Sequence, residues 1–316
     1  MSLELGFFIP PAPPEEFIKM ALRAEEVGYD FITCDDHMIY PFGAPFGEGE
    51  QEYGIHEAWT AMTYLAGATS KISVSHMVLV TTFRGPGLIA KMGATLDLFS
   101  GGRMDLTVGA GWFEREFRAF DFPWEGHKER VEREGEAVRI IRSLWSEPSV
   151  SVEGKYYRLD HAEITPKPLQ KPTPPIWIGG DSKRSMKVAA ELGDGWLVHA
   201  HQPHDISRMF QGIRPLLRHK AEGYGLGLAA FVIMGSDPEA ATGKMKEIIP
   251  PEVWKRFQMA GIKHELNNRV SGNPQQCLDR IKEYENVGLT RLICIFLDPE
   301  DAECFAQEVL PELRRG

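Results

Sequence analysis

Asp35, Asp36 and His37 stand together at the end of an apolar run, where they could exchange protons with a bound molecule. Successive side chains of a strand face opposite ways, so Asp35 and His37 would share one face and Asp36 would take the other. A histidine so placed can act as an acid, a base or a hydrogen-bond donor to a ring. A histidine considered alone more often serves the structure, and its position supports the functional interpretation. His37 is therefore the candidate catalytic residue.

Two glycine stretches expose backbone that a flat or phosphorylated ligand could approach closely. The first is Gly109-Ala110-Gly111, which Trp112 follows, and the second is Gly179-Gly180. The second leads into Asp181-Ser182-Lys183-Arg184, the predicted start of a helix. Free N–H groups, a serine and two cations at a helix start can bind an anion such as a phosphate. Both stretches could also be ordinary turns between a strand and a helix, because a Gly-Gly pair alone is a weak signal.

The histidines also allow a second chemistry. His199 and His201 form a His-x-His pair, and Asp36, Asp181 and Asp298 follow other apolar runs. Such groups can hold a divalent metal, so a metal-dependent hydrolase is an alternative function of a different class. No third ligand stands at a fixed spacing from the pair, and we therefore predict no metal site.

Eight short apolar runs would place these residues at the ends of strands. Most runs are continuous rather than alternating, which is typical of parallel strands covered on both faces. They are Leu5–Pro10, Tyr29–His37, Ile72–Thr82, Arg103–Trp112, Pro175–Gly180, Gly195–Ala200, Leu226–Gly235 and Arg291–Asp298. Segments with helical spacing separate them: Glu15–Val27, Glu57–Thr69, Gly87–Phe99, His127–Trp145, Lys183–Leu192, Asp205–Glu222, Pro274–Asn286 and Asp301–Leu313. The alternation predicts an α/β fold, a (β/α)8 TIM barrel formed by one domain over residues 1–316, with its site at the carboxyl ends of the strands.

Three connections are longer than the ordinary loops of a barrel, and such loops are usually functional. These insertions follow strands 2, 4 and 7, at Met38–His56, Phe113–Pro174 and Ser236–Asn273. The second includes a long helix and two short strands around Gly154, and the third is expected to contain one or two extra helices. An open doubly wound sheet is the alternative fold. It would usually carry a glycine-rich loop after its first strand, whereas this chain continues with PPAPPEE.

The composition predicts a soluble globular protein, because 43% of the 316 residues are apolar and 25% are charged. The formal net charge of −10, from 35 basic and 45 acidic residues, disfavours nucleic acid or an anionic membrane as the main partner. No apolar run approaches the ~20 residues of a membrane span, and no secretory signal is visible. Cys34, Cys277, Cys294 and Cys304 form no Cys-x-x-Cys pair. We expect reduced thiols in a cytoplasmic protein.

Several motifs in a fixed order carry a family resemblance. They are SGGRMDLTVGAGW at Ser100–Trp112, then EGKYYRLD and PKPLQKPTPPIWIGG after the long helix, and GDGW at Gly193–Trp196. With DDH before them and VSGNPQQCLDRIKEYENVGLTRLI after them, they resemble the bacterial luciferase-like superfamily, and within it the oxidoreductases that use the deazaflavin coenzyme F420. The fold of that family is a (β/α)8 barrel with a long insertion, which agrees with the strand count.

The resemblance implies a flavin or deazaflavin in the mouth of the barrel. Asp36 and His37 match residues that contact the ring system, and Gly109-Ala110-Gly111-Trp112 would border the ring. Members of the superfamily often carry a cis peptide bond without proline in the third strand, pressed against the ring. Here that bond would join Met77 and Val78.

The resemblance also implies where the tail of the cofactor lies. The Gly179-Gly180 turn and the helix start with Asp181, Ser182 and Arg184 would take the phosphate end, with His199 near the same tail.

The expected function is hydride transfer between an organic substrate and F420, and the alternative is an FMN-dependent monooxygenase supplied by a separate flavin reductase. One departure concerns a Glu that several deazaflavin dehydrogenases carry beside the strand-4 glycines. This chain has Gly111-Trp112 there, and Glu114 is close but not equivalent, so no role of that Glu carries over. A small-molecule substrate and a homodimer or higher homo-oligomer complete the expected partners.

Overall fold

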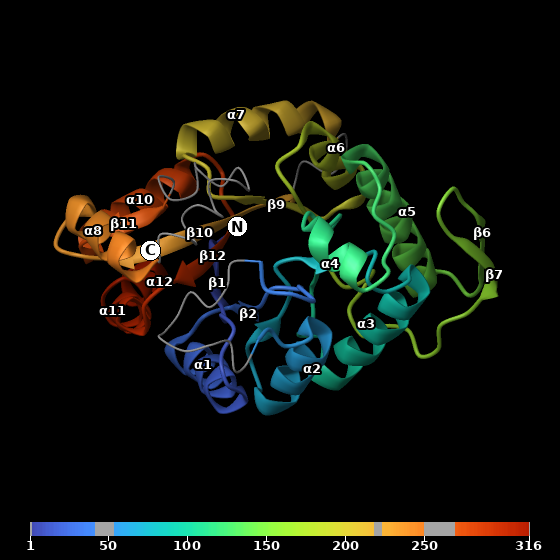
Figure 1. Ribbon diagram of the computed structural model, residues 1–316, viewed down its shortest axis with the longest axis horizontal. Helices are drawn as coiled ribbons and strands as arrows, with labels where there is room; N and C mark the ends of the chain where they lie inside the picture. Colours follow the sequence, from blue (N-terminus) through green and yellow to red (C-terminus); the bar gives the residue numbers. More distant parts are fainter. Residues whose placement is uncertain (1, 42–53, 218–222, 250–268, 316) are drawn as a thin grey trace.

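Parallel strands form a closed barrel in this computed structural model, which describes residues 2–41, 54–217, 223–249 and 269–315 (Figure 1). The paired strands follow the order β3-β2-β1-β12-β10-β9-β8-β5-β4. Their bounds are β1 Glu4–Phe8, β2 Phe31–Thr33, β3 Ser73–Val74, β4 Leu79–Val80, β5 Leu106–Gly109, β8 Ile176–Gly179, β9 Gly195–His199, β10 Gly225–Met234 and β12 Arg291–Phe296. Because β3 and β4 are two pieces of the strand predicted at Ile72–Thr82, the path ends on the strand where it began. The predicted TIM barrel is confirmed.

Helices cover the outside of the barrel in the predicted order. Their bounds are α1 Pro14–Val27, α2 Ala58–Ala68, α3 Pro86–Ser100, α4 Glu114–Ala119, α5 His127–Ser146, α6 Lys183–Leu192, α7 Pro203–Ile213, α8 Pro238–Ile248, α10 Pro274–Asn286, α11 Pro299–Glu308 and α12 Leu310–Arg315. The single helix predicted at Asp301–Leu313 is wrong, since the chain forms α11 and then α12. The helix predicted at Asp205–Glu222 is shorter, because α7 ends at Ile213 and a 3-10 turn at Arg214–Leu216 follows it; residues 218–222 lie outside the described residues.

The insertions are also in their predicted places. After α5, β6 (Val150–Glu153) and β7 (Arg158–Ala162) form an antiparallel hairpin apart from the barrel, as predicted around Gly154. The insertion after β10 contains α8 and then β11 (Val270–Gly272), a strand that the apolar pattern did not predict. Residues 250–268 of this insertion and residues 42–53 of the insertion after β2 lie outside the described residues.

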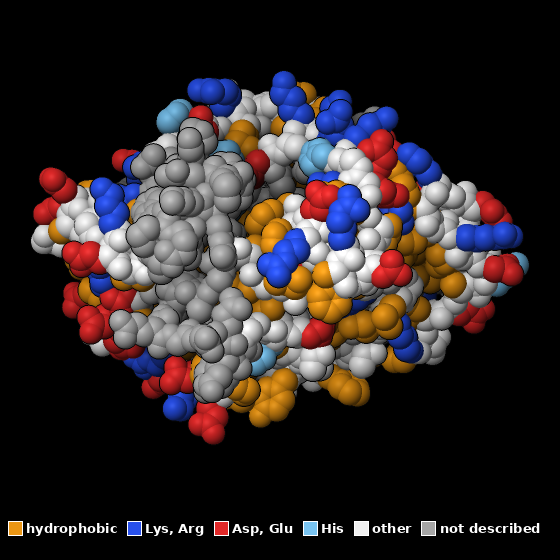
Figure 2. All heavy atoms as spheres, viewed as in Figure 1, with side chains coloured by type: hydrophobic (Ala, Val, Ile, Leu, Met, Phe, Trp, Pro, Cys, Tyr) orange, Lys and Arg blue, Asp and Glu red, His pale blue; other side chains and the backbone are white. Residues whose placement is uncertain are grey.

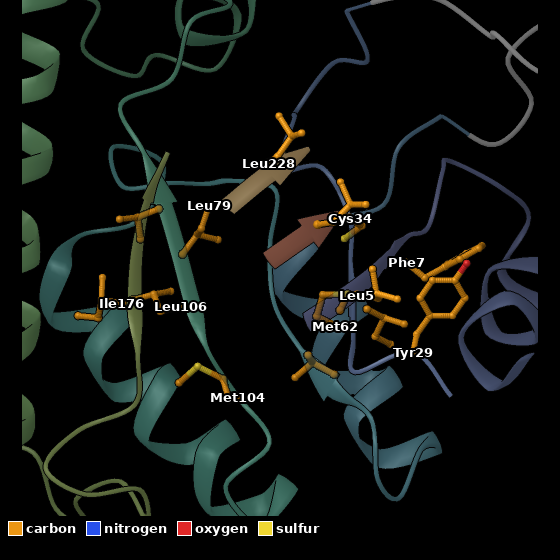
Figure 3. Close-up of a cluster of buried hydrophobic side chains, with 14 of the residues drawn as sticks. Leu5, Phe7, Tyr29, Cys34, Met62, Leu79, Met104, Leu106, Ile176 and Leu228 are labelled. Atoms are coloured by element: carbon orange, nitrogen blue, oxygen red, sulfur yellow. The ribbon is translucent and has the colours of Figure 1, made fainter. Parts of the chain in front are cut away.

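The core occupies the space between strands and helices and the amino-terminal half of the barrel. Leu5, Leu79, Leu106 and Leu228 come from four different strands and are all buried (Figure 3). All four cysteines are unpaired thiols. No helix among the described residues is long and apolar enough to cross a membrane.

Candidate active site

The carboxyl ends of the strands surround a cavity of about 440 Å³. Its lining includes every predicted site residue except Arg184: Asp36, His37, Met77, Val78, Gly109, Ala110, Gly111, Trp112, Gly179, Gly180, Asp181, Ser182 and His199. Arg184 is exposed on the first turn of α6. Side chains of β1, β9, β10 and β12, and of Leu297 directly after β12, give the cavity an apolar wall, formed by Phe8, Leu197, Ala229, Phe231, Ile295 and Leu297.

A bulge between β3 and β4 brings Val78 to the cavity. The Met77–Val78 peptide bond is cis, as predicted. A Cβ atom added at Gly109 would lie 2.4 Å from Cγ2 of Val78, and one added at Gly179 would lie 2.7 Å from Cγ1. These two glycines were predicted to admit a ligand to the backbone. Their missing side chains leave room for Val78, so that Val78 and both glycines line the cavity, and the approach of a ligand to their backbone stays a prediction.

The three polar residues after β2 have different environments. Strand β2 ends at Thr33, whereas the sequence predicted a strand that reaches His37. Asp35, Asp36 and His37 therefore lie in the segment after the strand. The Asp36 carboxylate accepts hydrogen bonds from Val80 N at 2.8 Å and from both terminal nitrogens of Arg84 at 2.8 and 2.9 Å. Asp36 therefore fixes the strand beside the bulge.

His37 is held by a carboxylate that the sequence analysis missed. Nδ1 of His37 lies 3.0 and 3.1 Å from the two carboxylate oxygens of Glu116, which also accept a hydrogen bond from Met38 N at 2.9 Å. Glu116 is 0% exposed. Burial opposes a charge on His37, but Glu116 and the nearby Asp35 outweigh it and raise the pKa of His37. Glu114, the neighbour considered from the sequence, instead pairs with Arg118 at 2.6 Å on the surface.

Asp35 lines the same cavity without such support. Its carboxylate takes part in no hydrogen bond among the residues that the structure describes. Burial raises the pKa of Asp35 to about 6, although the charges of His37 and His199 lower it. An acid of this kind can change its protonation near neutral pH.

One end of the cavity is cationic, and two of its residues were not predicted. His127 and Arg130, at the start of α5, line the cavity. Arg130 lies 3.9 Å over the Trp124 ring and donates to the carbonyl of Gly111 at 3.2 Å. Burial, Arg130 and Arg184 all lower the pKa of His127, which puts Arg184 near this end. Figure 2 shows basic side chains gathered over α5 and α6, at the upper right.

The predicted anion site at the start of α6 is partly occupied by the protein itself. The Ser182 hydroxyl accepts a hydrogen bond from Ser185 N at 3.0 Å and so caps the helix. Asp181 accepts a hydrogen bond from His199 N at 3.2 Å and lies 3.4 Å from Nε2 of His201. The N–H groups of Lys183 and Arg184, at the first two positions of α6, are the ones this cap leaves for an anion.

The residues weighed as metal ligands do not gather. In the described part of the chain, no three His, Cys, Asp or Glu side chains lie close enough together to hold a metal ion. Asp298 instead caps α11 and pairs with Lys244 at 2.5 Å. The hydrolase alternative thus has no support from this geometry.

Known proteins similar to this chain include both deazaflavin and flavin enzymes. A family model for luciferase-like monooxygenases matches residues 4–291. The chain is 34% identical to an F420-dependent glucose-6-phosphate dehydrogenase of Amycolatopsis mediterranei, covering 95% of both proteins. It is 29% identical to an FMNH(2)-dependent dimethylsulfone monooxygenase of Pseudomonas putida, covering 94% of this chain and 87% of that protein.

Solved structures confirm the fold. An F420-dependent secondary alcohol dehydrogenase, solved with an F420–acetone adduct, has a TM-score of 0.82 at 21% identity and covers 99% of this chain and 98% of its own. A long-chain alkane monooxygenase has a TM-score of 0.83 at 14% identity and covers 100% of this chain and 92% of its own. At these identities the likeness concerns the barrel alone.

Proposed function

Because the chain belongs to the luciferase-like monooxygenase family, we propose that it is an oxidoreductase that transfers a hydride between an organic substrate and coenzyme F420. The relative with 34% identity is named for this cofactor. The cavity suits a flat ring, with Val78 on one side and an apolar barrel wall on another. When bound, the deazaflavin would accept or donate the hydride. The protein would bind the cofactor and the substrate, orient them and exclude water.

The distribution of cations is the observation that carries this proposal. Arg130 lines the cavity, and Lys183 and Arg184 are exposed on the first turn of α6, where Arg184 is close enough to lower the pKa of the cavity residue His127. F420 continues past its phosphate into a chain of carboxylates, whereas FMN ends at its phosphate. Cations that continue from the cavity to the surface therefore favour the longer anionic tail.

The residues at the other end of the cavity would orient the reacting groups. Because Glu116 fixes Nδ1 of His37, Nε2 is the ring nitrogen that remains to contact the cofactor ring or the substrate. Trp112, 47% exposed at the mouth, packs edge-on against His37 with ring centroids 5.7 Å apart. Together these side chains would cover the reaction from solvent.

An FMN-dependent monooxygenase is the second candidate, supported by the relative that is 29% identical. The two ring systems have nearly the same shape, so the residues around the ring do not distinguish them. In that case a separate reductase would supply the reduced flavin.

Anaerobic titration with oxidised F420 and with oxidised FMN, followed by fluorescence, tests the choice directly. We expect F420 to bind at least tenfold more tightly than FMN. A comparison with the deazaflavin ring fragment that lacks phosphate and tail separates ring binding from tail binding. Preferential binding of FMN, or binding of F420 no tighter than that of the fragment, would contradict the proposal.

The assembly state and the cytoplasmic location stay predictions. Tyr64 on α2 and Leu88 and Phe99 on α3 are large apolar side chains exposed on neighbouring helices, and Phe99 is 87% exposed. Figure 2 shows apolar side chains standing out at the lower edge of the molecule. Such a surface is suited to a second copy of the chain, and sedimentation of the purified protein would reveal it.

A further inference from the structure

Two adjacent carboxylates at the cavity have opposite environments. Asp36 accepts three hydrogen bonds, two of them from Arg84. Asp35 also lines the cavity, and within the described residues its side chain accepts none. Neighbouring acids with such different surroundings commonly divide their roles, one holding the site and the other exchanging protons.

Charged groups from several elements surround Asp35 and act on its charge in opposite directions. His37 and His199 stabilise its charge, and Asp36 and Glu116 oppose it. Cys34 and Tyr40 are close enough for Asp35 to raise the pKa of each, after burial, which is the larger cause. Burial therefore decides the outcome and raises the pKa of Asp35 to about 6.

His37 is less suited to lose a proton. Its Nδ1 proton is shared with Glu116, which is fully buried. That proton stays between the pair, so His37 can exchange protons with a substrate only at Nε2. Burial lowers the pKa of His37, but Glu116 and Asp35 outweigh burial and raise it. The ring therefore keeps its proton to higher pH than an ordinary histidine and is better suited to donate a hydrogen bond from Nε2 to a substrate oxygen.

We propose that Asp35 is the acid–base residue of this site, and this inference rests on the proposed hydride transfer. In the oxidation of an alcohol, the bound deazaflavin would supply the acceptor for the hydride released when the C–H bond breaks. The Asp35 carboxylate would take the proton as the O–H bond breaks and the carbon–oxygen double bond forms. The substrate would thus give up two electrons with one hydrogen as a hydride and the other hydrogen as a proton, which Asp35 would hold. In the reverse direction the protonated Asp35 returns it to the carbonyl oxygen.

The apolar wall limits the substrate to an uncharged one. Phe231, Ile295 and Leu297 line the cavity with apolar side chains, and Arg130 is the arginine that lines it. We therefore infer an uncharged alcohol, or the corresponding ketone or aldehyde, as the substrate class.

Carboxyl NMR of the cofactor-free protein tests the first half of the proposal. A signal that titrates near pH 6 should be present in the wild type and absent from Asp35→Asn. If the lost signal titrates near pH 4, as an ordinary aspartate does, Asp35 is not poised for proton exchange and the proposal is overturned.

Steady-state kinetics with F420 and a panel of small uncharged alcohols and ketones test the second half. Alcohol oxidation should fall as the pH drops below about 6, and ketone reduction should fall as the pH rises above it. Asp35→Asn should lower kcat at least about 100-fold, with KM little changed. It should also abolish both limbs of the pH profile, the fall of oxidation at low pH and the fall of reduction at high pH. Asp35→Glu should restore the limbs, which a merely structural role would not do.

The outcomes separate the two proposals. If F420 does not bind, the proposed function itself is wrong. If F420 binds and turns over but Asp35→Asn keeps both limbs, only the role of Asp35 is overturned. If F420 binds and no alcohol or ketone reacts, the proton transfer to Asp35 is overturned as stated.

Discussion

The two ends of the barrel differ in how their charged side chains are paired. At the amino ends of the strands, the Arg291 guanidinium lies between the rings of Phe31 and Trp177, 4.4 and 4.2 Å from their centroids. It pairs with Asp105 at 2.9 Å and with Glu4 at 2.6 Å. At the carboxyl ends, Asp35 lines an open cavity and accepts no hydrogen bond from the described residues. At the amino ends, side chains fill the barrel and the charge of Arg291 is paired. At the carboxyl ends, polar side chains face a cavity that a ligand could enter.

This difference agrees with a division of labour along the barrel. Side chains at the amino ends of barrel strands usually serve stability, and those at the carboxyl ends serve chemistry. A group left unpaired for function costs stability, because burial without a partner is unfavourable. Substitutions at the two ends should therefore act on different properties.

The largest effect is expected at the closed end. Arg291→Ala would leave Asp105 buried without its charge partner, and breaking a buried pair in this way costs about 3–5 kcal/mol. Denaturant unfolding measures the loss. Arg291→Lys is the matched control, because it keeps the charge but not the planar group between the two rings, and its loss should be smaller. Equal losses for Ala and Lys would show that the charge contributes little.

At the open end, Asp35→Asn should stabilise the protein. The pKa of Asp35 is raised in the folded state to about 6, so its contribution to stability is full below about pH 4 and is lost as the pH rises through 6. The variant should therefore unfold with a free energy up to about 3 kcal/mol higher at pH 8 and with little difference at pH 4. A destabilised Asp35→Asn at pH 8 would contradict the comparison.

His37→Ala should separate function from stability at the same end. We expect cofactor binding or reduction to weaken at least tenfold, about 1.4 kcal/mol, with the fold intact by circular dichroism. Glu116→Gln should show a smaller effect, since the amide still accepts a hydrogen bond from His37 but no longer supports its charge. Unchanged binding and turnover in His37→Ala would refute its role.

The smallest effect is expected at Arg184, which is exposed on the first turn of α6. Arg184→Glu should raise the dissociation constant of F420 about threefold or more at low ionic strength and less at high salt, because exposed charges are screened. Binding of the tail-less ring fragment should not change. The same effect at every ionic strength would indicate that Arg184 acts through the structure.

Local sequence patterns were enough to predict where helices and strands lie, but not where a strand is broken. The bounds of α6 and α10 agree with the predicted residues, because apolar spacing and turn residues act over a few positions. The predicted strand Ile72–Thr82 divides into β3 and β4, since Val78 leaves the sheet to fill space that glycines on β5 and β8 provide. That space depends on strands distant in the sequence, although the resemblance to a family placed the cis bond correctly.

The sequence by itself determined the order of strands and helices, the closed barrel and the polar groups at its carboxyl ends. Each follows from periodicity and from the rule that parallel strands end at one face. The tertiary structure alone decided which groups pair there. Glu116 meets His37 across 79 positions of the chain and Arg84 meets Asp36 across 48, whereas the adjacent Asp35 lines the cavity without such a partner among the described residues. The sequence places the three residues side by side, but their partners come from other elements, and burial and hydrogen bonding by those partners set their charges.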